Sequence, residues 1–329
     1  MIEYIFLSVY RFSFFAIEPI ILSENNKGNI LRGAFGRELK KIVCINTNIP
    51  CYSCSIINSC AYQKIFSPVV NSTSKGLKKN RDLPRGYIIK PPLEPKTIYK
   101  EGEIISFDMV LTGELYKWFP YILIPIKELG EIGIGKNRGK FKLLKVDIFN
   151  PENMDWEMIY SSNNSTVRNL NFKIGDKYIK KRLESIDSNK IELEFLTPTR
   201  IKFNPNGQKE KSILVKKIEF HHIIKRLRDR VNRLGQIYCK DGLLTDDFKG
   251  IGKRAEKIKK TNDTTYWVTL YRRASSGKRH DISGFEGKIT FEGNLKEFLP
   301  LLILGEYLHV GEDAVIGHGW YRLRRGVGG

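Results

Sequence analysis

The sequence contains no long hydrophobic run. Its longest nearly apolar stretches, residues 118–126 and 298–304, are far shorter than the roughly 20 residues that a membrane-spanning helix needs. The first residues also lack the basic segment that opens a signal peptide, and the apolar residues after them alternate with polar ones. These absences exclude a transmembrane helix and predict a cytoplasmic protein without a membrane partner.

Acidic residues are few relative to basic ones. The chain has 36 Asp and Glu against 56 Lys and Arg, a net charge of +20. Such an excess favours nucleic acid as the partner, through phosphate contacts and counterion release, although a Lys-, Ile- and Asn-rich proteome gives the same balance. With 329 residues, 41% of them hydrophobic, the chain is a folded protein with room for two domains of about 150 residues each.

The two halves of the chain share an internal repeat. Residues 113–120 (GELYKWFP) resemble residues 293–300 (GNLKEFLP), 180 positions later. Each segment continues through an apolar stretch into Leu-Gly-Glu and a glycine-rich loop, and then into a β-rich run that begins near Phe141 or Tyr321. The repeated unit is therefore strand, helix, glycine-rich loop, strand.

A strand and a helix pattern precede each repeated unit. Alternating residues 4–14 are followed by a helical pattern at 30–43, and residues 191–203 are followed by a helical pattern at 218–234. Each half thus has the order βαββαβ, which is the ferredoxin-like or RRM-like order, with two helices on one face of an antiparallel sheet. The predicted fold class is α+β, with two tandem domains of this kind.

The boundary between the halves is predicted from a polar stretch rich in Ser and Asn. It runs over residues 151–188 and is interpreted as a linker or irregular insertion. The N-terminal domain is then expected at 1–150 and the C-terminal domain at 189–329.

The last glycine-rich segment contains Gly311, Gly317 and Gly319. Glycine lets backbone N–H groups approach a phosphate, although a tight helix-to-strand connection uses the same residues. Together with Arg272 to Gly277, Gly284 to Gly287 and Phe298 to Pro300, this segment resembles the C-terminal signature of the CRISPR-associated endoribonucleases that cut precursor CRISPR RNA. These enzymes belong to the RAMP superfamily.

The resemblance extends through most of the second half. Residues 197–201 and 220–230 match the strand and basic helix that open the family's second domain, whereas the first half matches more loosely, through residues 31–36 and 130–139 and through its cysteines. The resemblance implies an antiviral protein that binds CRISPR repeat RNA across two ferredoxin-like domains. It also implies metal-independent cleavage that leaves 5′-hydroxyl and 2′,3′-cyclic phosphate ends.

Basic residues and loop glycines are the predicted RNA contacts. The helix at 218–234 has an apolar stripe opposite a polar face that carries arginines, a pattern that an ordinary solvated face shares. The predicted RNA-binding residues are Lys40, Lys41, Arg226, Arg233, Arg272, Arg273, Lys278, Arg279, Gly311, Gly317 and Gly319.

Cleavage without a metal needs a base for the 2′-hydroxyl proton, an acid for the 5′-oxygen, and cations for the developing charge. Many family members place the base as a histidine on or near the first helix, but none of the five histidines here precedes His221. Three alternatives stay open: a histidine from the second half, a lysine- and arginine-based site, or an RNA-binding subunit of an effector complex that does not cut. The candidate catalytic residues are His222, His221 and Arg32.

Position in the helices supports these candidates. Lys225 and Arg226 lie one turn beyond the two histidines, and their charges favour the neutral, base-competent imidazole. Arg32 is spaced to share a helical face with Lys40, so the two could clamp a phosphate, although solvent exposure explains them equally well.

Four of the five cysteines fall within residues 44–60, at Cys44, Cys51, Cys54 and Cys60. The C-x6-C-x2-C-x5-C spacing suits a tetrahedral structural zinc site, and a reducing cytoplasm disfavours disulfides. An iron–sulfur cluster and a metal-free segment are the alternatives. A metal-binding insertion in the first domain is therefore predicted, with zinc as cofactor and no catalytic metal.

Overall fold

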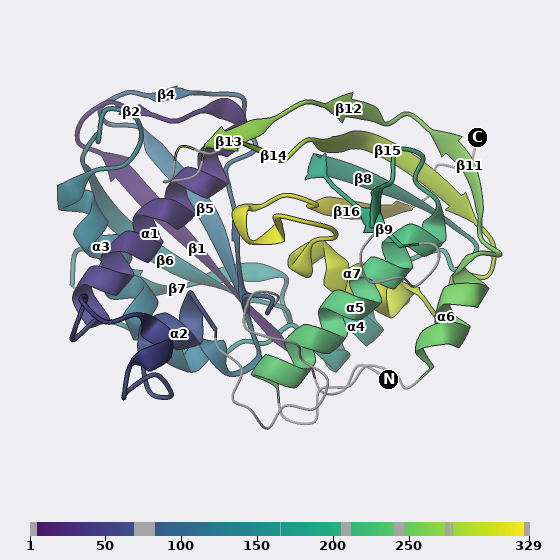
Figure 1. Cartoon of the computed structure of the whole chain (residues 1–329), viewed down its shortest axis with the longest axis horizontal. Helices are drawn as coiled ribbons and strands as arrows, with labels where there is room; N and C mark the ends of the chain where they lie inside the picture. The colour runs from purple at the N-terminus through teal and green to yellow at the C-terminus, as the bar shows by residue number, and fades with distance from the viewer. Residues whose placement is uncertain are drawn as a thin grey trace. The chain divides into compact units, whose positions relative to one another are not determined.

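The computed structural model of the chain describes residues 5–68, 83–164, 166–204, 212–239, 247–273, 277 and 279–325. Contacts between residues divide it into two compact units, both drawn in Figure 1. The N-terminal unit comprises Ile5–Lys173 and Arg233–Lys240, and the C-terminal unit is formed mainly by Ile174–Asn232 and Asp241–Gly329. None of the helices in the described parts of the chain is long and apolar enough to cross a membrane.

The N-terminal unit is built on a five-stranded antiparallel sheet of order β3-β5-β1-β6-β7. Its strands are β1 (Leu7–Ala16), β3 (Tyr87–Lys90), β5 (Ile104–Thr112), β6 (Phe141–Asn150) and β7 (Asp155–Ser161). A short ribbon pairs β2 (Ile20–Ile21) with β4 (Ile98–Tyr99). The helical segments are η1 (Glu24–Asn26), α1 (Lys27–Val43), η2 (Cys51–Ser53), α2 (Ala61–Ile65), η3 (Gly113–Trp118) and α3 (Pro120–Ile132). Helices α1 and α3 pack side by side, and α3 also packs on β6 (Figure 1).

The C-terminal unit repeats this topology in the sheet β11-β15-β8-β16, with β12 also paired to β15. These strands are β8 (Lys190–Thr199), β11 (Lys259–Asp263), β12 (Tyr266–Val268), β15 (Gly284–Glu292) and β16 (Tyr321–Arg325). Two ribbons pair β9 (Lys202–Phe203) with β10 (Ile213–Leu214), and β13 (Tyr271–Arg273) with β14 (Arg279–Asp281). The helical segments are α4 (Asp176–Leu183), α5 (Phe220–Tyr238), α6 (Phe248–Ala255), α7 (Leu299–Leu308) and η4 (Ala314–Ile316).

In both sheets the first strand of the unit lies between the third and the fourth, and the second strand lies at the edge beside the third. This arrangement is the one that the βαββαβ order predicts. The α+β class and the two ferredoxin-like domains are confirmed.

Close helix–strand packing explains the repeated Leu-Gly-Glu motif. A Cβ on Gly130 of α3 would lie 2.3 Å from the carbonyl oxygen of Phe141, the first residue of β6. A Cβ on Gly305 of α7 would lie 2.0 Å from the hydroxyl of Tyr321, the first residue of β16. Each glycine therefore lets its helix approach the last strand of its own ferredoxin-like sheet.

The stretch interpreted as a linker, residues 151–188, contains regular structure and needs correction. Strand β7 extends the N-terminal sheet beside β6, and helix α4 packs against α7. Tyr160 of β7 and both Tyr178 and Ile179 of α4 are buried, so a mostly polar stretch still supplies enough apolar side chains to anchor both elements. The two units meet in the sequence at Lys173 and Ile174, not near residue 188.

Candidate functional site

One face of α1 carries Arg32 and Lys40 against aromatic rings of the α2 segment. The guanidinium carbon of Arg32 lies 4.6 Å from the centre of the Phe66 ring, and Lys40 Nζ lies 5.9 Å from the centre of the Tyr62 ring. Gly36 lies between the two cations, where a Cβ would lie 2.1 Å from the Phe66 ring. The predicted shared face is therefore present, and cation–π packing holds Arg32 in place.

A second guanidinium, that of Arg85, lies near Arg32. Arg85 Nε donates to the carbonyl oxygen of Phe66 at 2.9 Å. Burial, and then the positive charge of Arg32, lower the pKa of Arg85. Within the described ranges neither guanidinium forms an ion pair with a carboxylate. Two neighbouring cations without a counter-charge form a site that attracts a phosphate.

His221 and His222 lie in the first turn of α5 and pack against Phe203, with ring centroids 5.9 and 5.0 Å away. The backbone N–H of Glu219 donates to His222 Nδ1 at 3.1 Å. Burial, and then the neighbouring His221, lower the pKa of His222 to about 4. Burial, and then Lys225, lower the pKa of His221. Both rings are therefore neutral near pH 7, but His222 has its Nδ1 lone pair engaged and carries its proton on Nε2.

The glycines of the last loop have steric reasons to be glycine. Gly311, Gly317 and Gly319 adopt φ values of +91°, +93° and +70°. A Cβ on Gly311 would lie 2.3 Å from the carbonyl oxygen of Arg200, and a Cβ on Gly319 would lie 1.8 Å from that of Val310. The local fold alone accounts for these residues, and their contact with RNA stays a prediction.

Buried side chains and an ion pair hold the same loop. The His309 Nδ1 lies 3.1 Å from the carbonyl oxygen of His318, and the His309 ring stacks on Trp320 at a centroid distance of 5.8 Å. Arg272, a predicted RNA contact, pairs with Asp313 of the loop at 3.6 Å. Burial lowers the pKa of His318. Arg272, which was predicted to contact RNA, therefore already has a structural partner within this loop, the carboxylate of Asp313.

The ribbon of β13 and β14 carries the other cations predicted near this loop. The Arg279 guanidinium carbon lies 3.7 Å from the centre of the Tyr271 ring, and Arg279 pairs in register with Arg273. Only the backbone of Arg273 is described, and Lys278 lies outside the described residues.

The remaining basic residues that were predicted to bind RNA differ in their surroundings and contacts. Arg226 Nε donates to the carbonyl oxygen of Lys202 at 2.7 Å, and Lys41 pairs with Glu38 at 3.2 Å. Arg233 is exposed and belongs to the N-terminal unit, whereas Arg226 belongs to the C-terminal unit.

The four clustered cysteines, Cys44, Cys51, Cys54 and Cys60, line one small cavity of about 20 Å³. Each is half-buried, and each is a free thiol. As placed, no three Cys, His, Asp or Glu side chains in the described parts of the chain could hold a metal ion together. The number and chemistry of the donors fit zinc, but the side chains do not form a ready ligand set, so the metal-binding part of the insertion is not supported here.

Comparison with known proteins gives two family matches and a distant relative. The model described as the AF_1859_N N-terminal domain matches residues 5–172, and the model described as CRISPR-associated endoribonuclease Cas6 matches residues 193–321. An uncharacterized protein of Archaeoglobus fulgidus is 24% identical over 305 residues, which cover 90% of this chain and 91% of that protein.

Solved structures agree with the fold. A Cas6 (TTHB231) product complex matches with a TM-score of 0.58 at 12% identity, over 96% of this chain and 99% of that chain. Thermus thermophilus Cas6 (TTHB231) gives 0.52 at 11% identity, over 96% and 98%. A partial Cas6-RT-Cas1–Cas2 complex gives 0.57 at 12% identity, over 99% of this chain and 47% of that chain.

Two tandem ferredoxin-like units make up the chain, and the second of them carries the match to the model described as CRISPR-associated endoribonuclease Cas6. The chain belongs to the family described as the AF_1859_N N-terminal domain, whose model matches residues 5–172, and its second unit is Cas6-like.

Proposed function

We propose that this protein is a cytoplasmic, metal-independent endoribonuclease that binds CRISPR repeat RNA and cuts precursor CRISPR RNA into guide units. The observation that carries the proposal is the Cas6 family match over residues 193–321, which spans the C-terminal sheet and its glycine-rich loop. A net charge of +20 supports a polyanionic substrate. The similarity to a structure described as a Cas6 product complex agrees with this substrate class.

The proposed reaction begins when a general base takes the proton of a ribose 2′-hydroxyl. The 2′-oxygen attacks the adjacent phosphorus, and the 5′-oxygen leaves with a proton from a general acid, which gives a 2′,3′-cyclic phosphate and a 5′-hydroxyl. We assign the base to His221, because the Nδ1 of neighbouring His222 already accepts from Glu219. Independently of this base, Arg32 and Arg85 of the N-terminal unit are proposed to bind a phosphate of the repeat RNA.

Cleavage of labelled repeat RNA in EDTA tests these roles. His221→Ala is expected to abolish cutting while RNA affinity stays within about twofold. Arg32→Ala is expected to weaken RNA binding about tenfold, as loss of a phosphate contact does. His222→Ala and Arg37→Ala are the matched controls and are expected to cut within about tenfold of wild type and to bind RNA within about twofold of it, since neither is given a role. Unchanged cutting by His221→Ala would overturn the assignment of the base, and unchanged affinity of Arg32→Ala would overturn the phosphate site.

A second function, a repeat-RNA-binding subunit of an effector complex that does not cut, is favoured by the histidines. No histidine precedes His221 in the sequence. The His222 ring accepts a hydrogen bond from Glu219 at Nδ1, so it has no free lone pair with which to act as a base. This function predicts salt-dependent, repeat-specific binding and no cyclic-phosphate product under any metal condition.

We also propose that the cysteine segment holds a structural zinc ion. The four thiols that line one cavity and their spacing support this. Elemental analysis of protein purified without added metal should find about one zinc per chain, and Cys51→Ser/Cys54→Ser should lose it. Iron with visible absorbance, or no metal in freshly purified protein, would overturn the assignment.

A further inference from the structure

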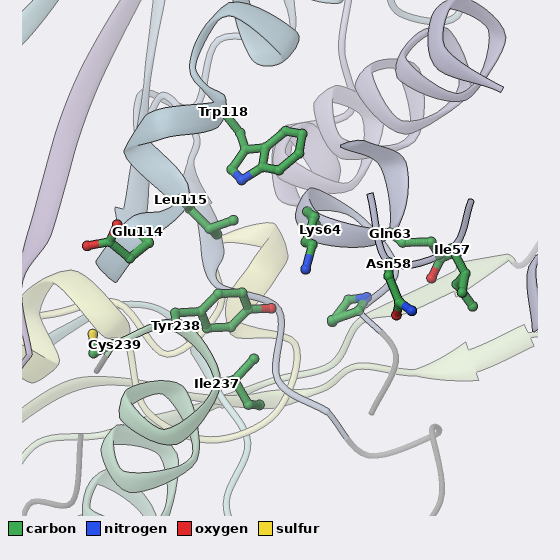
Figure 2. A pocket seen from close by; sticks show the side chains of 11 residues that line it. Ile57, Asn58, Gln63, Lys64, Glu114, Leu115, Trp118, Ile237, Tyr238 and Cys239 are labelled. Atoms are coloured by element: carbon green, nitrogen blue, oxygen red, sulfur yellow. The ribbon is translucent and has the colours of Figure 1, made fainter. Parts of the chain in front are cut away.

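The N-terminal unit contains a cavity that the residues discussed so far do not use. Its volume is about 430 Å³, within the usual range of about 300–1,000 Å³ for sites that take small organic groups. Side chains from residues 57–68, from η3 and from the last residues of α5 line it, and Figure 2 shows Trp118, Lys64 and Tyr238 near one another among them. All of these residues belong to the N-terminal unit.

Aromatic rings supply the flat surfaces. Trp118 is half-buried and faces the cavity from η3, and Tyr238 faces it from the end of α5 (Figure 2). The Tyr238 hydroxyl donates to the carbonyl oxygen of Pro84 at 3.2 Å, which fixes that ring. Unpaired bases of RNA bind proteins chiefly by stacking on such rings.

The charges around the cavity suit a nucleotide. Lys64 is exposed on α2 and lines the cavity, where its ammonium group can meet a phosphate. Glu114 also lines it, but its carboxylate is paired with Lys117, so its repulsion of a phosphate is reduced. Pocket size, rings and cation therefore point to one class of ligand.

We propose that this cavity takes an unpaired nucleobase of the bound RNA, stacked on Trp118, with Lys64 beside its phosphate. The inference rests on the proposed RNA-binding function and adds a base-reading site to it. Sequence reasoning missed the site because its residues are far apart in the chain and none belongs to a charged or glycine-rich motif.

An abasic scan of repeat RNA tests the proposal. Each nucleotide is replaced in turn by an abasic one, and the affinity of each RNA is measured for wild-type protein and for Trp118→Ala. One abasic position is expected to weaken wild-type binding about tenfold, a typical loss for one stacked base, and to weaken Trp118→Ala by less than about twofold.

Two controls separate the outcomes. Trp156→Ala removes a tryptophan of β7 that packs under Arg11, and it should retain the full abasic effect. Trp118→Phe keeps a stacking ring and should restore most of the effect. Specific wild-type binding with no abasic position that depends on Trp118 overturns the pocket alone. Failure of wild-type protein to prefer repeat RNA over a scrambled sequence overturns the proposed function and this inference with it.

Discussion

The two glycine-rich loops occupy corresponding places in the two units but are held by different chemistry. In the N-terminal loop a Cβ on Gly135 would lie 2.3 Å from the carbonyl oxygen of Ile21, and the Asn137 side chain accepts from the Ile21 N–H at 3.0 Å. In the C-terminal loop a Cβ on Gly311 would lie 2.3 Å from the carbonyl oxygen of Arg200. In each unit the loop therefore packs closely against the backbone that follows the first strand of its own sheet.

The difference lies in the charges. The Asn137 amide is neutral, whereas the C-terminal loop is bound by ion pairs from Arg272 to Asp313 and from Arg200 to Glu312. The shared glycines belong to the fold, since both loops need them for steric reasons. A glycine-rich loop is therefore weak support for RNA binding by itself. The N-terminal loop carries the exposed cations Lys136 and Arg138, whereas the acidic residues of the C-terminal loop, Glu312 and Asp313, pair with arginines from outside it.

The largest effect is expected at the tightest glycine. Gly319→Ala should lower the free energy of unfolding by at least about 3 kcal/mol, because the backbone has φ of +70° and a Cβ would lie 1.8 Å from the Val310 carbonyl oxygen. Chemical denaturation measures it. Gly102→Ala has φ of +84° but open space within 4 Å, and it should cost only about 1 kcal/mol. Equal losses would show that the close approach has no energetic weight.

The loss of stability on replacing each of the two helix glycines by alanine should depend on which atom the new Cβ meets. Gly130→Ala should cost about 2 kcal/mol, because its Cβ meets the backbone carbonyl of Phe141, which moves little. Gly305→Ala should cost about 1 kcal/mol, since its Cβ meets the far end of the Tyr321 side chain. Both replacements gain helix propensity, so the comparison is matched. A larger loss at Gly305 would contradict this account of the repeat.

Removing one arginine near each loop should change the salt dependence of RNA affinity to different extents. Arg272→Gln is expected to reduce the slope of log affinity for repeat RNA against log salt by about 1, as loss of one phosphate contact does. Arg138→Gln, in the N-terminal loop, should leave the slope unchanged. Equal slopes for wild type and Arg272→Gln would show that Arg272 pairs with Asp313 and does not contact the RNA.

The smallest effect is a pH dependence. The pKa of His222 is lowered to about 4, so below pH about 6.5 the unfolded state binds more protons than the folded state and stability falls as the pH falls toward 4. His221→Gln/His222→Gln should flatten this decline in the denaturation midpoint between pH 6.5 and about 4.5. The same slope in wild type and variant would show that neither ring is held neutral.

The architecture was predictable because the repeat recurs at positions where packing demands particular residues. Gly130 with Phe141 and Gly305 with Tyr321 are pairs in which a small helix residue faces the next strand, and such pairs leave a periodic trace in the sequence. The region 151–188 was misjudged because its polar composition hid the few buried residues of β7 and α4.

The candidate site was predictable only where it follows one element. Arg32 and Lys40 share a face because they are two helical turns apart on α1. Arg85 and Trp118 gain their environments only through tertiary packing, Arg85 beside Arg32 and Trp118 in the wall of a cavity, so no local pattern marks them.

The central claim is that this protein cuts repeat RNA with the RNA's own 2′-hydroxyl as nucleophile. The most direct measurement compares, in EDTA, a repeat RNA with the same RNA carrying a single 2′-deoxy nucleotide on the 5′ side of the mapped cut. We expect the unmodified RNA to be cut once, leaving a 2′,3′-cyclic phosphate, and the substituted RNA to bind equally well and stay intact. Cutting of both RNAs at that position, or of neither, would contradict the account.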